Sequence, residues 1–184
     1  MFRTSKIRIT IRTLALGTVA SLSVAMSSIA HAHVTLETRE APVGASYKAV
    51  MRVPHGCDGT ATTSVRIRMP EGFIAVKPMP KPGWKLDVVK GKYPKTYNLQ
   101  HGVTLTEGVT EVAWSAGNLP DAYYDEFVFT GTIADDLKAG QTIYFPVVQE
   151  CEKGLHRWIE IPAGGHDHGD SREPAPGLRL SPKR

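Results

Sequence analysis

Two histidines, His31 and His33, lie at the end of an N-terminal leader, where cleavage would make one of them the first residue of the exported chain. Cleavage after Ala32 leaves His33 first, so that its new α-amine and its imidazole can chelate one ion. A strongly bound cation displaces the amine proton at neutral pH, because the amine's pKa is only about 7.7–8.0. Cleavage after Ala30 leaves His31-Ala32-His33, which can supply a square-planar set of nitrogens. Nitrogen-rich tetragonal sites suit Cu(II), so either product predicts copper chemistry at the new N-terminus.

Residues 1–32 have the pattern of a cleaved secretory signal peptide. Residues 1–12 carry basic side chains and no acid, residues 14–30 are apolar with small interruptions, and small residues occupy the −3 and −1 positions of both cleavage sites. The apolar stretch is too short and too diluted by Ser and Thr for a membrane anchor. The mature chain is therefore expected in the periplasm or secreted.

The charge balance argues against a nucleic-acid partner. The chain has 22 basic and 18 acidic residues, but four of the basic ones lie in the leader, so the remaining 18 balance the acids. A nucleic-acid-binding domain would carry a clustered basic patch, and none is present.

Two cysteines, Cys57 and Cys151, lie in the exported part of the chain. An even count in an oxidising compartment favours a disulfide over the alternatives, a copper-binding thiolate pair or two buried thiols. A cross-link that closes so long a loop would stabilise the domain by about 4 kcal/mol in the chain-entropy model.

Apolar and polar residues alternate along the mature chain in the way that is typical of strands with one buried face. In 47–53 the odd positions are apolar and two of the three even ones are basic, and the alternation in 65–69 is strict. Further strands are expected at 34–38, 85–89, 97–100 with 103–106, 109–115, 127–133, 143–148 and 157–161, and one helical turn at 135–138. Gly- and Pro-containing turns between such short strands predict an all-β, antiparallel β-sandwich.

Residues 163–184 differ in composition from the rest. They combine His166-Asp167-His168 with several prolines and offer few apolar side chains for burial. We therefore expect a disordered tail there, which leaves 33–162 as the folded domain.

Short motifs follow one another in a fixed order along residues 33–162. They are His33-Val34-Thr35-Leu36-Glu37, Val53-Pro54, 61–70, Pro82-Gly83-Trp84-Lys85, Val112-Ala113-Trp114, 125–129 and Arg157-Trp158-Ile159-Glu160. This series resembles the YcnI-type (also written YncI) copper-binding domain, a family of exported bacterial proteins. The resemblance implies a β-sandwich of immunoglobulin- or cupredoxin-like topology. It also implies a Cu(II) site built from the amine and imidazole of an N-terminal histidine, with a carboxylate ligand and a tryptophan close by.

His33 matches the N-terminal histidine of that family, which favours cleavage after Ala32, and Trp158 matches the site tryptophan. The carboxylate ligand of that family has no direct counterpart in this chain. Where other members have a glutamate after Val-Pro, this chain reads His55-Gly56-Cys57-Asp58. Asp58 is the nearest acid and is expected as the carboxylate, while His55 is the alternative as a second nitrogen ligand. A disulfide from Cys57 would tie this loop to the strand that leads into Trp158.

The resulting hypothesis is a non-catalytic, exported copper(II)-binding protein for copper homeostasis or delivery. Its partners would be the ion and another periplasmic copper chaperone or a membrane copper transporter. The alternatives are an oxidative enzyme of the lytic polysaccharide monooxygenase type, which needs a second histidine, and a metal-independent extracytoplasmic interaction module. The chain has no Gly-x-Ser-x-Gly elbow for a serine hydrolase. His156 is expected to be an ordinary exposed histidine.

Overall fold

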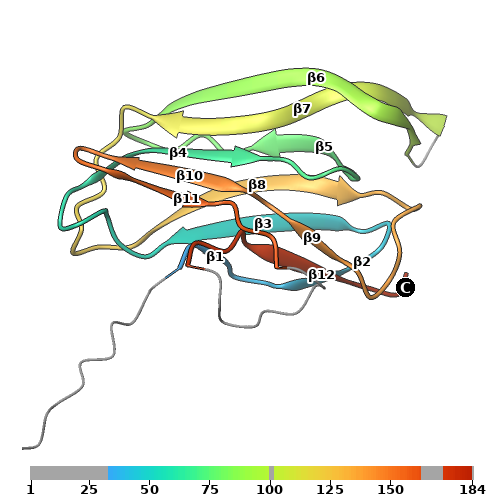
Figure 1. The fold of residues 1–184 in the computed structure, drawn as a ribbon. Coiled ribbons are helices and arrows are strands. Elements are labelled where there is room, and N and C mark those ends of the chain that lie inside the picture. Colours follow the sequence, from blue (N-terminus) through green and yellow to red (C-terminus); the bar gives the residue numbers. More distant parts are fainter. Residues whose placement is uncertain (1–32, 100–101, 163–171, 184) are drawn as a thin grey trace, which may run out of the picture. The chain divides into compact units, whose positions relative to one another are not determined.

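The structure is a computed structural model that describes residues 33–99, 102–162 and 172–183 (Figure 1). The predicted signal peptide, 1–32, lies outside the described residues. The described chain is built from β-strands, most of them paired antiparallel, which confirms the all-β prediction. Within these ranges no helix is long and apolar enough to cross a membrane.

One sheet has four strands, and every neighbouring pair in it is antiparallel. Its order is β1 (Thr35–Leu36), β3 (Ser46–Val53), β8 (Asp125–Ile133) and β5 (Phe73–Pro78). The alternation predicted for β3 is observed, because Lys48 and Arg52 are exposed while the apolar residues on either side of each are buried.

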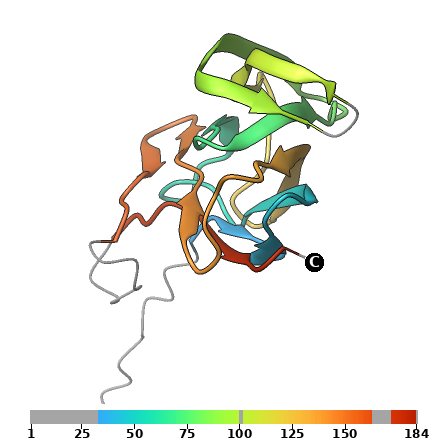
Figure 2. The same ribbon diagram turned by 90° about the vertical axis from the view of Figure 1, so that its right-hand side faces the viewer.

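A second sheet has five strands, and one of its edge strands contains His156 and Trp158. Its order is β11 (Leu155–Trp158), β10 (Val147–Cys151), β4 (Thr62–Arg68), β7 (Thr104–Ser115) and β6 (Lys85–Asn98). The β6–β7 hairpin lies on one side of the domain and the third sheet on the other (Figure 2). That third sheet consists of β2 (Glu40–Pro42), β12 (Gly177–Ser181) and β9 (Thr142–Tyr144).

The core is rich in aromatic side chains that contact one another edge to face. Phe73 contacts Phe145 with ring centroids 5.2 Å apart, and Trp114 contacts Phe127 at 5.5 Å. Such contacts add to the burial of large apolar surfaces. Because these residues come from different sheets and from the segment between β9 and β10, they join the layers of the predicted β-sandwich.

The C-terminal segment corrects the prediction of a disordered tail over 163–184. Residues 177–181 form β12, which pairs parallel with β2 and antiparallel with β9. Leu178 and Leu180 are fully buried, whereas Arg179 between them is exposed. A period-2 pattern of only two leucines is easily missed among prolines, so the prediction was wrong for 172–183. Residues 163–171 lie outside the described residues.

Two further predictions are corrected between β8 and β10. The strand expected at 143–148 is divided into β9 and β10, which lie in different sheets. Pro146 stands between them, and proline has no N–H to continue a ladder. Residues 135–138 form a non-helical turn instead of the expected helical turn.

Tyr47 in β3 provides a test of the fold at alkaline pH. Its hydroxyl donates a 2.5 Å hydrogen bond to the carbonyl of Thr38. Burial, together with the negative charge of Glu37, raises the pKa of Tyr47 from 10.0 to about 12. The neutral phenol therefore contributes stability that is complete below pH 10 and is lost as the pH rises towards 12.

We expect Tyr47→Phe to be less stable than the wild type by about 1 kcal/mol below pH 10, because the hydrogen bond is lost. Above pH 10 its free energy of unfolding should fall less steeply. Burial also raises the pKa values of Tyr93 and Tyr97, so part of the slope remains. Urea unfolding between pH 8 and pH 11.5 measures both effects. Parallel curves for the two proteins above pH 10 would contradict the role of Tyr47.

Candidate functional site

His33 lies directly before the first strand, and its neighbours hold it in place. Val34 and Leu36 are each 2% exposed, and the β1 residues Thr35 and Leu36 pair with Arg52 and Met51 of β3. The residue predicted to begin the mature chain is thus followed at once by buried, hydrogen-bonded backbone. A ligand at this position would be ordered by the fold.

Trp158 ends β11 and is 4% exposed. The imidazole of His33 meets its indole edge to face, with ring centroids 5.5 Å apart and an interplanar angle of 85°. The structure therefore brings together the two residues that the family resemblance assigned to one site, although more than 120 positions separate them in the sequence.

Gln149 of β10 connects Trp158 to the loop that contains His55. Its side chain is fully buried, and its Oε1 accepts a 3.1 Å hydrogen bond from Trp158 Nε1. Its Nε2 donates to the carbonyl of His55 at 2.7 Å and to Thr62 Oγ1 at 2.8 Å. A fully satisfied buried amide of this kind fixes the positions of all its partners.

His156 is not the ordinary exposed histidine that the sequence led us to expect. It is half-buried, and its ring lies 5.0 Å from that of Trp158 at an angle of 34°. Its Nδ1 is 2.7 Å from Glu173 Oε1. Glu173 Oε2 accepts a 2.9 Å hydrogen bond from the backbone N–H of Arg157. His156 and Glu173 therefore hold β11 to the C-terminal segment.

Opposing effects act on the pKa of Glu173. Its partial burial favours the neutral acid and raises the pKa. The hydrogen bonds from His156 and from the Arg157 backbone, with the positive charges of those two side chains, outweigh burial and lower the pKa below its ordinary value. At neutral pH Glu173 is therefore a carboxylate.

His55 lies beside His156, with ring centroids 6.3 Å apart and planes at 85°. Its Nδ1 is 2.6 Å from the carbonyl oxygen of Gly56. Gln149 holds the His55 backbone, and Asp121 Oδ1 accepts a 3.0 Å hydrogen bond from the Gly56 N–H. The loop after β3 thus presents His55 to the exposed edge strand β11.

The predicted disulfide between Cys57 and Cys151 is present. It ties the 57–60 turn to the end of β10. Thr60 Oγ1 reinforces this connection by donating a hydrogen bond to the carbonyl of Lys153 at 3.0 Å. As the sequence suggested, the cross-link joins the loop that contains His55 to the strand pair that ends at Trp158.

Asp58 lies in a tight turn between Cys57 and Thr60. Asp58 and Gly59 have φ values of 47° and 79°, and the backbone groups of Cys57 and Thr60 bond each other in both directions. This is a type I′ turn, for which Asp-Gly is a preferred pair. The Asp58-Gly59 pair is therefore a local sequence signal for this turn.

The position of Asp58 also separates it from the candidate site. A side chain added at Gly154 would come within 4.0 Å of Asp58 Oδ2, so Asp58 lies against the turn that joins β10 to β11. Trp158 lies four residues after Gly154, about 13 Å from Gly154 at the usual rise of a strand. Glu173, by contrast, is hydrogen-bonded to His156, whose ring contacts that of Trp158.

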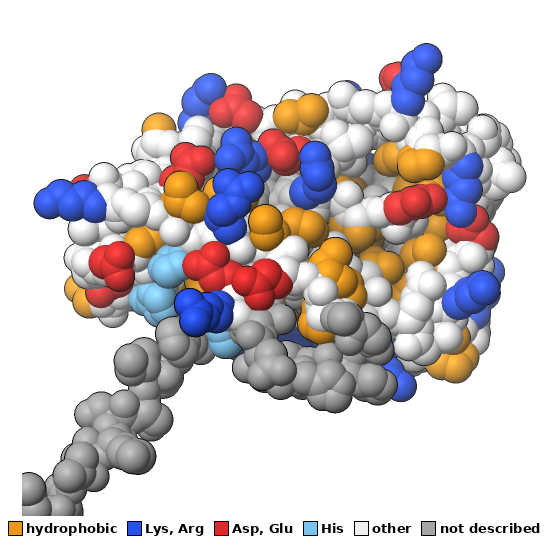
Figure 3. Space-filling view, viewed as in Figure 1, with side chains coloured by type: hydrophobic (Ala, Val, Ile, Leu, Met, Phe, Trp, Pro, Cys, Tyr) orange, Lys and Arg blue, Asp and Glu red, His pale blue; other side chains and the backbone are white. Residues whose placement is uncertain are grey.

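The histidines that the structure describes and this view shows lie on one part of the surface, close to acidic and basic side chains (Figure 3). In the described ranges, no group of three or more His, Cys, Asp or Glu side chains is arranged to hold an ion.

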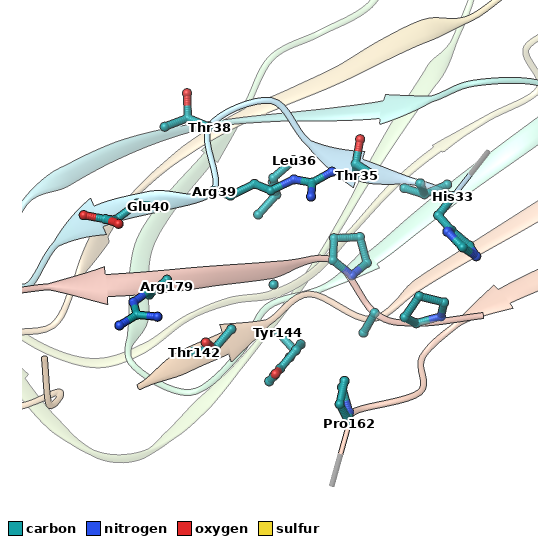
Figure 4. A pocket seen from close by; sticks show the side chains of 15 residues that line it. His33, Thr35, Leu36, Thr38, Arg39, Glu40, Thr142, Tyr144, Pro162 and Arg179 are labelled. Carbon is teal, nitrogen blue, oxygen red and sulfur yellow. The ribbon is translucent and has the colours of Figure 1, made fainter. Parts of the chain in front are cut away.

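A pocket of about 590 Å³ opens beside His33 between β1–β2 and β9–β12. His33 stands at one end of it, and Glu40 and Arg179 stand towards the other (Figure 4). Thr142 and Tyr144 of β9 add polar groups to its wall. His33 is therefore reachable from solvent while its neighbours Val34 and Leu36 are buried.

Sequence reasoning missed Gln149, His156 and Glu173. His156 and Trp158 lie on an edge strand at spacing i, i+2, which places both rings on one face, and this signal was readable. Nothing local marks Gln149 or Glu173, because their partners come from distant segments.

Comparison with known proteins gives a family and a fold. The profile of a family described as "Domain of unknown function (DUF1775)" matches residues 33–180. No curated protein matches the chain. A solved structure from Nocardia farcinica, described as an uncharacterized protein with an immunoglobulin-like fold, is 24% identical with a TM-score of 0.57. The match covers 81% of this chain and 98% of that one, and it supports the immunoglobulin-like topology.

Proposed function

This chain belongs to the DUF1775 family, a domain family of unknown function, and we propose that the protein is an exported copper(II)-binding protein that holds its ion at His33. The observation that carries this proposal is the contact between the His33 imidazole and the buried indole of Trp158, 5.5 Å apart. Signal-peptide cleavage after Ala32 would add the α-amine of His33 to the imidazole on the same residue.

The chemistry of the groups present fits Cu(II). An amine and an imidazole are nitrogen donors, which Cu(II) prefers, and His33 can supply both from one residue. Trp158 would cover one side of such an ion and limit its contact with solvent. The strand that follows His33 would reduce the entropy that binding costs, because the ligand residue is already ordered.

A disulfide is typical of exported proteins, and this supports a periplasmic or secreted location for the binding site. Within that compartment the protein would store the ion or pass it to a second periplasmic copper chaperone or to a membrane copper transporter. The role is coordination without catalysis.

The test uses the processed protein that begins at His33. We expect His33→Ala to lose one equivalent of bound Cu(II) together with an axial EPR signal, as measured by calorimetric titration and EPR. A chain with one alanine added before His33 is the matched control for the amine, because it keeps the imidazole. It should bind Cu(II) more weakly than the wild type.

Unchanged Cu(II) stoichiometry and EPR signal in His33→Ala would disprove the proposal. Peroxide-driven oxidation of a polysaccharide by the copper-loaded protein would favour the monooxygenase alternative. A protein that binds no copper at all would favour a metal-independent interaction module.

A further inference from the structure

His55 and His156 are both hydrogen-bonded through Nδ1. The Nδ1 atom of His55 is 2.6 Å from the carbonyl oxygen of Gly56. The Nδ1 atom of His156 is 2.7 Å from a carboxylate oxygen of Glu173. A carbonyl oxygen only accepts, so Nδ1–H of His55 must be the donor. At neutral pH the Glu173 carboxylate likewise only accepts, so Nδ1–H of His156 is the donor in its pair. In a neutral ring the lone pair is then on Nε2 in both residues.

This arrangement is the usual one for histidines that bind metals. Such a histidine donates its other ring N–H to a carboxylate or a backbone carbonyl, which fixes the tautomer and orients the ring. Here His55 donates to a backbone carbonyl and His156 to a carboxylate. The tautomer that a metal requires at Nε2 is therefore already selected in both rings.

The two rings are also at a suitable distance. A metal lies about 2.0–2.1 Å from an imidazole nitrogen and roughly one ångström more from the ring centre, so two rings on opposite sides of one ion have centres roughly 6 Å apart. The centroids of His55 and His156 are 6.3 Å apart. The observed separation of the two rings is therefore close to that of two imidazoles bound to one ion.

Both residues stand on parts of the fold that are cross-linked. His156 lies in β11, which pairs with β10, and Gln149 of β10 holds the His55 carbonyl. The disulfide joins the next turn of the loop to the end of β10. Both rings are half-buried, so an ion can reach them from solvent.

We propose that His55 and His156 form a second metal site, with Glu173 as the positioning residue, that binds one imidazole-preferring transition-metal ion such as Cu(II) or Zn(II) independently of His33. The remaining coordination positions are taken by water. The site does not need the α-amine of His33 and would exist whichever leader cleavage occurs.

The experiment compares variants of the processed protein in separate calorimetric titrations with CuCl₂ and ZnCl₂. His33→Ala is expected to retain one equivalent of ion. His33→Ala combined with His156→Gln should lose it, and so should His33→Ala combined with His55→Gln. The matched control, His33→Ala with His101→Gln, removes a histidine from another part of the sequence and should retain the ion.

Two further measurements separate a ligand role from a structural one. Glu173→Gln in the His33→Ala background should weaken binding by about 10–100-fold without abolishing it, as expected for a residue that orients a ligand. In the ¹⁵N spectrum, Zn(II) should shift the Nε2 signals of His55 and His156 in the His33→Ala protein, which needs no substitution at the site.

The inference is overturned if His33→Ala binds neither ion, or if the equivalent survives the loss of His55 or His156. It is also overturned if Zn(II) leaves both Nε2 signals unmoved. If His33 does not bind copper, a different result is expected, because the wild type and His33→Ala would then bind the same number of ions.

Discussion

Replacing Leu178 and Leu180 together with alanine is expected to leave much of the protein unfolded at 25 °C. Both side chains are fully buried, and each Leu→Ala change in a core costs about 2–5 kcal/mol. The two changes together approach the total stability of a typical domain, about 5–15 kcal/mol. Urea unfolding followed by tryptophan fluorescence would show a much lower midpoint, or no folded baseline.

Arg179→Ala is the matched control, because Arg179 lies between the two leucines on the same strand but is exposed. Its free energy of unfolding should stay within about 0.5 kcal/mol of the wild type. If the double leucine variant unfolded at the wild-type urea concentration, β12 would not be an integral part of the sandwich. The domain would then end near residue 162, as the composition of the tail suggested.

Removal of the disulfide is expected to have the second large effect. The bond closes a loop between residues 94 positions apart, and the chain-entropy model gives about 4–5 kcal/mol for a loop of this size. Cys57→Ala with Cys151→Ala should therefore unfold at a markedly lower urea concentration than the oxidised wild type.

The matched control is the wild-type protein under a reducing agent strong enough to open the bond. It should unfold close to the double alanine variant, because both have lost the same cross-link. Equal midpoints for the oxidised wild type and the double variant would contradict a stabilising role. The loop that contains His55 should also lose order, and the ¹⁵N signals of His55 would report this directly.

The copper proposal and the second-site proposal depend on different parts of the molecule. The first depends on a chain terminus and its contact with one indole, whereas the second depends on two side chains whose Nδ1 atoms are already hydrogen-bonded. Trp158 lies between them, since both His33 and His156 contact its ring. A copper ion at His33 should therefore quench Trp158 fluorescence, which offers a simple optical check in either titration.

The sequence by itself determined the features that depend on neighbouring residues. The leader pattern, the alternation in 47–53 and the pair of exported cysteines predicted a leader, an all-β fold and a disulfide, and the structure confirms the fold and the disulfide. Asp58-Gly59 also carries a local signal for the type I′ turn that the structure has there.

Only the tertiary structure decided which side chains surround Trp158. Glu173 reaches His156 because β12 enters the third sheet beside β2, and Gln149 holds His55 because β10 packs against the loop after β3. These contacts depend on strand register and on burial between segments that are distant in sequence. Local periodicity shows that a residue faces inward or outward, but it does not show which residue it will meet there.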